Sequence, residues 1–216
     1  MLKDVIALHP GEWQLLHRFD ASSVADGQTR PPPFLLVRRG VHGEGTCFFH
    51  AVAASLNYRN ILGMDVVQDN AKIQQAGLDL RSKFNVWGRK AGLSDDVLVI
   101  LRDPTAWSES RVVEFVSALF GLDFLFFDTK DASKKWACER FGGQSKYERK
   151  RLVMLIHWCQ KNHFEALGLL KGGDVGAKTV DVQFVFDPDS DEDRPFLNRI
   201  QADFKHSCPG PKNFFT

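Results

Sequence analysis

The segment from Phe34 to Leu56 constrains the fold of this chain more than any other. A short apolar run, "FLLVRR", leads through the loop "GVHGEG" towards Cys47. From Cys47, apolar residues recur at spacings of three and four, which predicts a helix, and Phe49 and Ala53 add apolar side chains to its opposite side. A helix that is apolar on nearly all sides is usually buried at the centre of a domain. We therefore expect a strand, a glycine-rich loop and a central helix, in that order.

The rest of the chain is predicted to form one domain with two flanking segments. A length of 216 residues suits a single domain with a core of its own. The prolines of "RPPP" end an N-terminal extension over residues 1–33. The acidic stretch "DPDSDED" opens a linker and tail over residues 187–216. We therefore expect the folded domain to span residues 34–186.

Three further helices are predicted from apolar periodicity and from residues that suit helix ends. The first spans roughly residues 66–91. The second, "SDDVLVIL", starts at Ser94, whose side chain is a good N-cap. The third is capped by Ser108, ends at Gly121 and runs directly into an apolar strand at residues 122–128. A helix that leads straight into such a strand predicts a layered arrangement of helices and sheet.

The C-terminal half is predicted to be rich in strands. The runs "RLVMLIHWC" and "HFEALGLL" are separated by only three residues, a spacing typical of a β-hairpin. Apolar residues alternate over "KTVDVQFVF" at residues 178–186, which predicts a half-buried strand. The polar and basic stretch at residues 129–151 is interpreted as a solvated loop or helix face.

Charge and cysteine content narrow the function classes. With 28 basic and 27 acidic residues the net charge is +1, so nothing indicates a nucleic-acid-binding surface. The four cysteines follow no secretory signal, and residues 1–20 hold neither a signal peptide nor a membrane span. We therefore expect a reduced, soluble, cytoplasmic protein.

Cys47 has two interpretations. A cysteine at a helix N-terminus lies near unpaired backbone amides and the positive end of the helix dipole, which favour the nucleophilic thiolate and lower its pKa. The preceding glycines would let backbone amides approach an oxyanion. Free cysteine is also among the most buried residue types, so a packing role for Cys47 stays open.

Of the seven histidines, His163 best suits a general base for Cys47. Glu165 follows at i+2 and therefore shares a strand face with His163. A carboxylate in that position would orient the imidazole and stabilise its cation. The sequence "HFE" also suits an ordinary strand with one polar face. His50, on the same predicted helix as Cys47, is interpreted as a structural or surface residue.

A zinc site is the rival interpretation of the same region. His157, Cys159 and His163 have ligand types that suit zinc. A structural zinc site usually has four ligands, and no close fourth stands in the sequence. We therefore expect no metal, while a zinc-stabilised interaction domain remains the alternative.

Three blocks of the sequence together resemble the OTU (ovarian tumour) cysteine proteases, which act as deubiquitinases. The cysteine block of that family is similar to "GEGTCFFHAVAASL" here. Its second block, a tryptophan, a helix and a strand, is similar to "WSESRVVEFVSALFGLDFLFFD". Its third, a strand, a turn and a histidine, is similar to "LVMLIHWCQKNHFEAL". The blocks occur in the family's order and span roughly residues 34–170.

The resemblance implies a fold, a site and an activity. The fold is α+β, papain-like, with a small central sheet flanked by helices. The implied catalytic residues are Cys47 as nucleophile, His163 as base and Glu165 as the acid that orients it. The implied oxyanion loop consists of Gly43, Glu44, Gly45 and Thr46, and the amide of Cys47 is implied as a further oxyanion donor. The implied reaction is hydrolysis of the (iso)peptide bond that follows the C-terminal glycine of ubiquitin.

The resemblance also implies partners and departures. The expected partners are ubiquitin, polyubiquitin chains or ubiquitin-like modifiers, bound by a monomer that needs no cofactor. A viral or bacterial effector acting on ubiquitin in the host cytosol is compatible with the divergent blocks. Glu44, Thr46 and Glu165 replace the usual Asp, Asn and Asp or Asn of the family. Trp107 is interpreted as a core residue or as a wall of the substrate channel. A non-catalytic ubiquitin-binding module is the other alternative.

Overall fold

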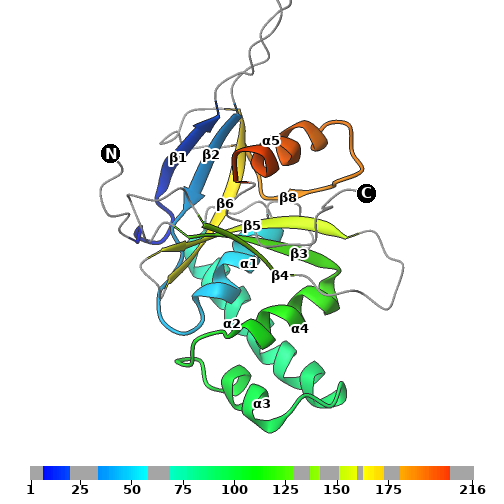
Figure 1. Ribbon diagram of the computed structural model, residues 1–216. Helices are drawn as coiled ribbons and strands as arrows, with labels where there is room; N and C mark the ends of the chain where they lie inside the picture. The colour runs from blue at the N-terminus through cyan, green and yellow to red at the C-terminus, as the bar shows by residue number, and fades with distance from the viewer. Residues whose placement is uncertain are drawn as a thin grey trace, which may run out of the picture.

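The structure is a computed structural model that describes residues 7–19, 34–57, 69–128, 137–141, 151–159, 163–172 and 181–204. Along the described residues, two strands are followed by four helices, six strands and a last helix, and Figure 1 shows their arrangement. In chain order they are β1 (Trp13–Phe19), β2 (Phe34–Arg39), α1 (Cys47–Asn57), α2 (Asn70–Lys90), α3 (Asp95–Arg102), α4 (Ser110–Phe120), β3 (Leu122–Asp128), β4 (Ala137–Phe141), β5 (Leu152–Cys159), β6 (His163–Gly172), β7 (Asp181–Gln183), β8 (Val185–Phe186) and α5 (Arg194–Phe204).

The strands form one eight-stranded sheet with the order β1-β2-β6-β5-β3-β4. The short strands β7 and β8 pair with β6 and β5 respectively. All pairs are antiparallel except β3 with β5, which pair in parallel with β4 between them in the chain. The α+β class predicted from the sequence is confirmed. The predicted hairpin is also confirmed, because β5 and β6 pair antiparallel from His157↔Glu165 to Cys159↔His163.

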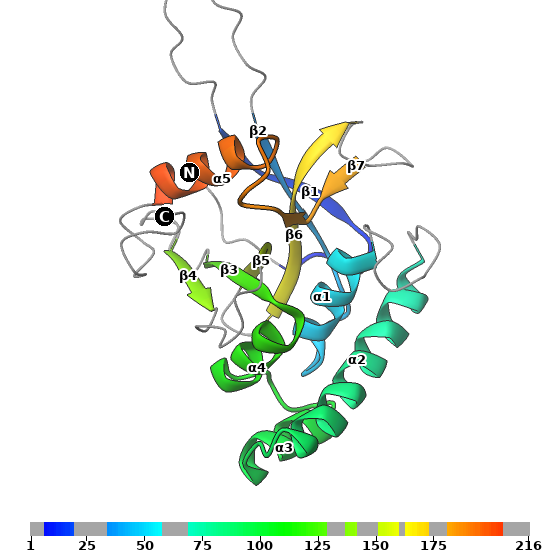
Figure 2. The ribbon, with the colours of Figure 1, turned by 90° about the vertical axis from the view of Figure 1, so that its right-hand side faces the viewer.

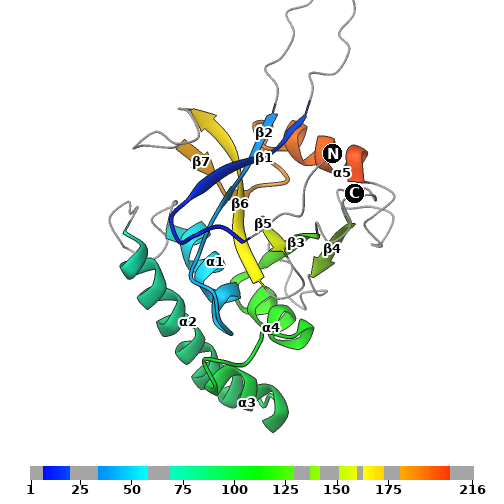
Figure 3. The same cartoon turned by 90° about the vertical axis from the view of Figure 1, so that its left-hand side faces the viewer.

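Helices cover both faces of this sheet. Helices α1 to α4 lie on one side and α5 lies on the other (Figures 1, 2 and 3). Alternate side chains of β6 point to opposite faces of the sheet and so belong to different cores. Phe164 and Ala166 belong to the core beneath α1, whereas Leu167 and Leu169 belong to the core beneath α5. The protein therefore has three layers and two hydrophobic cores.

Helix α1 is the centre of the larger core, as its all-round apolar sequence predicts. Every residue from 47 to 56 is buried. Phe48 packs edge-on against Phe124 of β3 and Phe164 of β6, with ring centroids 5.5 and 5.8 Å apart. This packing fixes the N-terminus of α1, and Cys47 with it, relative to the start of β6.

Several local expectations are refined by the structure. The residue at the N-cap of α4 is Glu109, so the helix begins one residue later than a Ser108 cap would place it. Gly121 does end the helix, with φ of 66°. Within the stretch 129–151, the described residues Ala137–Phe141 form strand β4 instead of the loop or helix face expected from the sequence. The strand predicted at residues 178–186 is divided into β7 and β8 at Phe184, which turns into the core beneath α1.

Two elements of the sheet and its cover lie outside residues 34–186. Strand β1 pairs with β2 along its length, with register shifting near Leu15 and His17. Helix α5 places Phe196, Leu197 and Ile200 in the core beneath the sheet. The folded unit therefore includes parts of the expected N-terminal extension and C-terminal linker. Within the described ranges, no helix combines the length and the hydropathy needed to cross a bilayer.

Candidate active site

The loop before Cys47 is held in a backbone conformation that its sequence only partly explains. Glu44 has φ of 70°, a left-handed conformation that is uncommon for a residue other than glycine. Gly45 must lack a side chain, because a Cβ there would clash with the backbone of Thr105 and Ala106. Among the hydrogen bonds of the described residues, none uses the amides of Glu44, Gly45 or Thr46 as donors. These amides are therefore free to bind an anionic oxygen.

The amide of Cys47 differs from its neighbours in the loop. It donates to Glu44 O over 3.3 Å, a long hydrogen bond that closes a turn. The sequence interpretation includes this amide among the oxyanion donors. In this structure it would have to leave Glu44 O, or share its hydrogen, before it could serve an oxyanion.

Arg81 of α2 is almost completely buried and donates hydrogen bonds to this loop. Its Nη1 donates to Gly45 O at 2.8 Å and to Thr46 Oγ1 at 3.2 Å. Its Nη2 donates to Ala106 O at 2.7 Å and to Ile100 O. In a trans peptide the C=O and N–H point in opposite directions. By holding Gly45 O, Arg81 therefore turns the Thr46 amide away from itself.

Cys47 is a buried free thiol. Burial raises its pKa to about 11, although the backbone amides of Phe164, Phe48 and Cys47 itself and the charge of Arg81 act in the opposite direction. The sequence interpretation predicts a lowered pKa from the helix N-terminus, and for this resting conformation that prediction is wrong. The reason is that desolvation of a fully enclosed thiolate exceeds the stabilisation from nearby amides and Arg81.

The predicted nucleophile and base belong to different layers that meet at the start of β6. Cys47 lies in the core beneath α1. His163 and Glu165 share the face of β6 that carries Leu167, which is the side of α5. Phe164 stands between them, and its backbone amide acts on the Cys47 thiol as a hydrogen-bond donor. Within the described residues, no hydrogen bond joins Cys47 to His163.

Glu165 is buried and accepts three hydrogen bonds. Its Oε2 accepts from Arg38 Nη1 at 2.8 Å and from His157 Nδ1 at 3.0 Å, and its Oε1 accepts from the Leu8 amide at 2.7 Å. Burial raises the pKa of this carboxyl, but His157, Arg38 and the Leu8 amide together lower it by more, so the pKa lies below its usual value. Glu165 is therefore a carboxylate at neutral pH.

His163 faces the same carboxylate from a greater distance. Its Nε2 lies 3.9 Å from Glu165 Oε1 and has no hydrogen-bond partner among the described residues. Burial lowers the pKa of His163, against the opposing effect of the Glu165 charge. The imidazole is therefore neutral at pH 7, which is the form that accepts a proton.

The sequence interpretation missed Arg38, His157 and Arg81 as parts of this region. Arg38 stands at the end of "FLLVRR", where a charged residue suits solvent, yet it is buried against Glu165. His157 was considered only as a metal ligand. Its alternation with Cys159 in "LIHWC" does signal one shared strand face. His50, which the sequence interpretation gives a structural or surface role, is buried, with Nδ1 3.1 Å from His42 O.

One group of side chains has metal-ligand chemistry. Ligand atoms of His157, Cys159 and Glu165 lie within 4.8 Å of one another, and all three residues are buried. Cys159 is a free thiol whose pKa is raised to about 12 by burial and by the charge of Glu165. The sequence interpretation includes His157 and Cys159 among the candidate zinc ligands but not Glu165.

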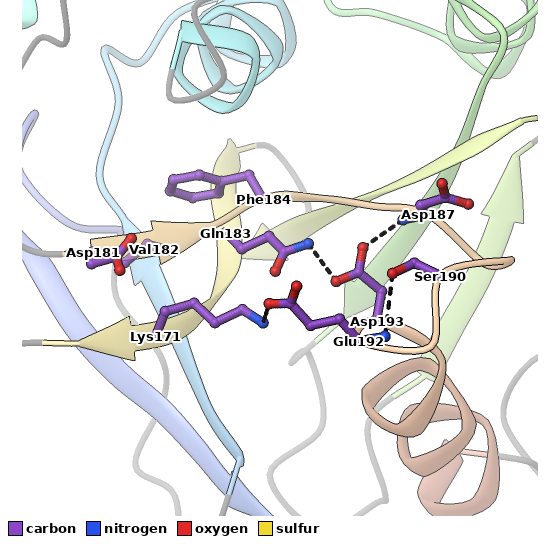
Figure 4. Close-up of a pocket in the computed structure, with 9 residues that line it drawn as sticks. All are labelled: Lys171, Asp181, Val182, Gln183, Phe184, Asp187, Ser190, Glu192 and Asp193. Atoms are coloured by element: carbon purple, nitrogen blue, oxygen red, sulfur yellow. Dashed lines mark hydrogen bonds and ion pairs between the residues drawn. The ribbon is translucent and has the colours of Figure 1, made fainter.

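A pocket of about 550 Å³ lies elsewhere, between β6, β7 and the start of α5 (Figure 4). Its polar residues serve the fold. Asp193 accepts from Gln183 Nε2 and from the Asp187 amide, each at 2.7 Å, and Lys171 pairs with Glu192 at 3.0 Å. These contacts connect the turn before α5 to the sheet. Figure 4 shows no histidine or cysteine among the residues that line the pocket.

Fold and site together define an α+β domain in which a cysteine begins a buried helix beside a strand that carries histidine and glutamate. No protein-family model matches the sequence, and no curated protein matches it. Solved structures to which it is similar include OTU domains. The OTU domain of OTUD1 is 11% identical over 61% of this chain and 85% of its own, with a TM-score of 0.46.

Two other similar structures are described as complexes. An OTU domain in complex with ubiquitin is 15% identical, covering 79% of this chain and 86% of its own, with a TM-score of 0.42. The Hazara virus OTU bound to ubiquitin is 17% identical, covering 71% of this chain and 97% of its own, with a TM-score of 0.39. At these identities and TM-scores, neither an activity nor a residue role is transferred to this chain.

Proposed function

We propose that this protein is a deubiquitinating cysteine protease in which Cys47, His163 and Glu165 form the catalytic triad. The observation that carries the proposal is the arrangement at the start of β6. The Phe164 amide lies against the Cys47 thiol, with His163 immediately before it and the anchored carboxylate of Glu165 immediately after it. This arrangement supports the proposal because a nucleophile, a neutral base and an ionised acid all lie near the start of β6, although Cys47 and His163 are not yet in contact.

The proposed reaction uses the two nitrogens of His163 for different tasks. Nε2 faces Glu165, so Nδ1 is the nitrogen that accepts the proton of Cys47. The thiolate attacks the carbonyl carbon of the ubiquitin C-terminal glycine, and the amides of Glu44, Gly45 and Thr46 bind the oxyanion. The His163 cation then protonates the leaving lysine amine. Water hydrolyses the thioester and returns the proton to the cysteine.

The resting site is closed. Cys47 has no exposed surface, and its pKa of about 11 keeps it protonated at neutral pH. Attack on a substrate therefore requires a local opening that exposes Sγ and lets His163 reach it. We propose that binding of the ubiquitin C-terminal tail supplies that opening, because its two glycines have no side chains to obstruct a narrow channel.

The remaining functional assignments are part of the same proposal. Polyubiquitin chains and ubiquitin-like modifiers are the candidate substrates, and the cytosol is the expected compartment. Catalysis by a thiol and an imidazole needs no cofactor. A monomer suffices, because all the groups named above come from one chain.

The test is a ubiquitin that carries an electrophile at its C-terminus. We expect a covalent adduct with the wild type, none with Cys47→Ala and a strongly reduced yield with His163→Ala. Cys159→Ala is the matched control, because it removes another buried free thiol. A correctly folded, metal-free wild type that forms no adduct and cleaves no ubiquitin chain would exclude the proposal.

A second candidate, a ubiquitin-binding module without turnover, is favoured by one observation. Glu165 is hydrogen-bonded to Arg38 and His157, while His163 stays 3.9 Å away. Such a module would bind ubiquitin with the same affinity in the wild type and in Cys47→Ala. It would leave the electrophilic probe unreacted, so the same experiment separates the two functions.

A further inference from the structure

Two cross-strand pairs place four metal-ligating residues on one face of the sheet. His157 of β5 lies opposite Glu165 of β6, and Cys159 lies opposite His163. Because alternate residues of a strand share a face, all four side chains lie on the same side. Ligand atoms of His157, Cys159 and Glu165 are within 4.8 Å of one another, and His163 Nε2 is 3.9 Å from Glu165 Oε1.

We propose that His157, Cys159, Glu165 and His163 form a zinc site, and that zinc bound there prevents catalysis by Cys47. The second half of this inference rests on the proposed function, because Glu165 and His163 cannot serve the metal and the triad together. The first half is independent of it.

The donor set and its spacing fit zinc. Thiolate, imidazole and carboxylate are the ligands that Zn²⁺ takes in proteins, usually four of them in a tetrahedron. Zinc–ligand bonds of about 2.0–2.3 Å place ligand atoms roughly 3.5 Å apart. The ligand atoms of His157, Cys159 and Glu165 are spaced slightly more widely, so these three side chains close on the ion by about 1 Å each or less. His163 lies outside that group of three and has to move further to become the fourth ligand. His163 Nε2 is buried and lacks a hydrogen-bond partner within the described residues, which leaves it available as the fourth ligand.

Neighbouring groups already support Glu165 as a ligand. Arg38 Nη1 and the Leu8 amide donate to its two oxygens at 2.8 and 2.7 Å. Hydrogen bonds of this kind commonly orient metal-bound carboxylates. Arg38 also repels a cation, and this repulsion is offset when the Cys159 thiol releases its proton on binding. Because at least that one proton is released, zinc affinity rises with pH.

The experiment uses the full chain, stripped of metal by a chelator and titrated with Zn²⁺, with Co²⁺ as the spectroscopic probe. We expect stoichiometric binding and a thiolate-to-cobalt absorption band in the wild type. Cys159→Ala should lose the band and bind Zn²⁺ at least about 100-fold more weakly, since even the loss of a supporting group costs 10–100-fold. Cys159→Ser provides the same test if the alanine variant does not fold.

Cys47→Ala identifies which thiol holds the metal. It should bind Zn²⁺ and show the cobalt band as the wild type does. Loss of binding in Cys47→Ala, or wild-type affinity in a folded Cys159 variant, would overturn the proposal, as would a wild type that binds no Zn²⁺. Zinc should also suppress adduct formation with the ubiquitin electrophile in the wild type, reversibly on chelation. A protein that binds zinc through Cys159 but never reacts with the probe would refute only the proposed function.

Discussion

Glu165 lies closer to His157 than to His163. Its Oε2 accepts from His157 Nδ1 at 3.0 Å, whereas its Oε1 and His163 Nε2 are 3.9 Å apart. The carboxylate is also fixed by Arg38. The acid of the proposed triad is thus held in place by groups other than the base it would orient. In the proposed mechanism, His163 moves towards Glu165 to complete the contact.

The buried pair of Arg38 and Glu165 leads to the first prediction. Glu165→Gln removes the carboxylate that pairs with the buried Arg38 guanidinium, so we expect the free energy of unfolding to fall by about 3–5 kcal/mol. Chemical denaturation measures it. Glu192→Gln is the control, because Glu192 pairs with Lys171 at 3.0 Å but is 76% exposed. Its change should stay below about 1 kcal/mol. Equal losses for the two variants would contradict a structural role of the buried pair.

Arg81 leads to the second prediction, which concerns the geometry of the loop rather than substrate affinity. Without its hydrogen bond to Gly45 O, the peptide that carries the Thr46 amide is free to rotate away from the oxyanion. We expect Arg81→Met to lower kcat about 100-fold on a ubiquitin substrate, with little change in KM.

Two variants complete that test. Arg81→Lys should recover part of the rate, because an ammonium group can hold some of the carbonyls but lacks the planar fork. Arg111→Met removes an exposed arginine that pairs with Asp96 and should leave kcat unchanged. A rise in KM alone for Arg81→Met, measured on protein with a normal thermal melt, would show that the loop does not depend on Arg81.

The main elements could be predicted from the sequence because their cause is local. The apolar periodicity after Cys47 is enough to predict helix α1. The short apolar runs are likewise enough to predict strands β2, β3, β5 and β6. Strand β1 and helix α5 were not predicted. Only their contacts with β2 and with the core beneath the sheet stabilise them, and those contacts lie far away in the chain.

The candidate site also has features that could be predicted from the sequence and features that could not. The spacing of His163 and Glu165 fixes a shared face from the sequence alone. The partner of Glu165 could not be predicted, because Arg38 is 127 residues away and its position next to Arg39 suggests an exposed strand end. The pKa of Cys47 also could not be predicted. The helix N-terminus is a local feature, whereas burial depends on the entire fold.

Trp107 leads to the third prediction. Its side chain is 44% exposed, which rules out a place in the core, and a wall of the substrate channel is the other role that the sequence interpretation proposes. It follows Thr105 and Ala106, whose backbone packs against Gly45. We expect Trp107→Ala to raise KM for a ubiquitin substrate about tenfold, equivalent to about 1.4 kcal/mol, with little effect on kcat. Leu119→Ala is the control, since Leu119 is 46% exposed on α4. Identical kinetics for both variants would remove Trp107 from the substrate channel.

The fourth prediction concerns the pH dependence of Cys47 and follows from its raised pKa. A thiol with a pKa of about 11 is ionised at pH 7 to a fraction on the order of 10⁻⁴. Alkylation of Cys47 by a small reagent should therefore be slow at neutral pH. The alkylation rate should rise about tenfold per pH unit up to about pH 10. The rate for an exposed cysteine reaches its plateau at lower pH, because the pKa of an exposed thiol is lower. Mass spectrometry of the Cys47 peptide in Cys159→Ala measures this without interference from the second buried thiol.

The ubiquitin electrophile should give a different profile on the same protein. Its tail opens the site and His163 accepts the proton, so adduct formation depends on the neutral imidazole and reaches its plateau near neutral pH. In protein unfolded by denaturant, the reaction of Cys47 with either reagent should show the pH dependence of an exposed cysteine. If the small reagent already reached its plateau by pH 8 on the folded protein, the resting thiolate would be formed without substrate, and the closed state described by the structure would not be the state in solution.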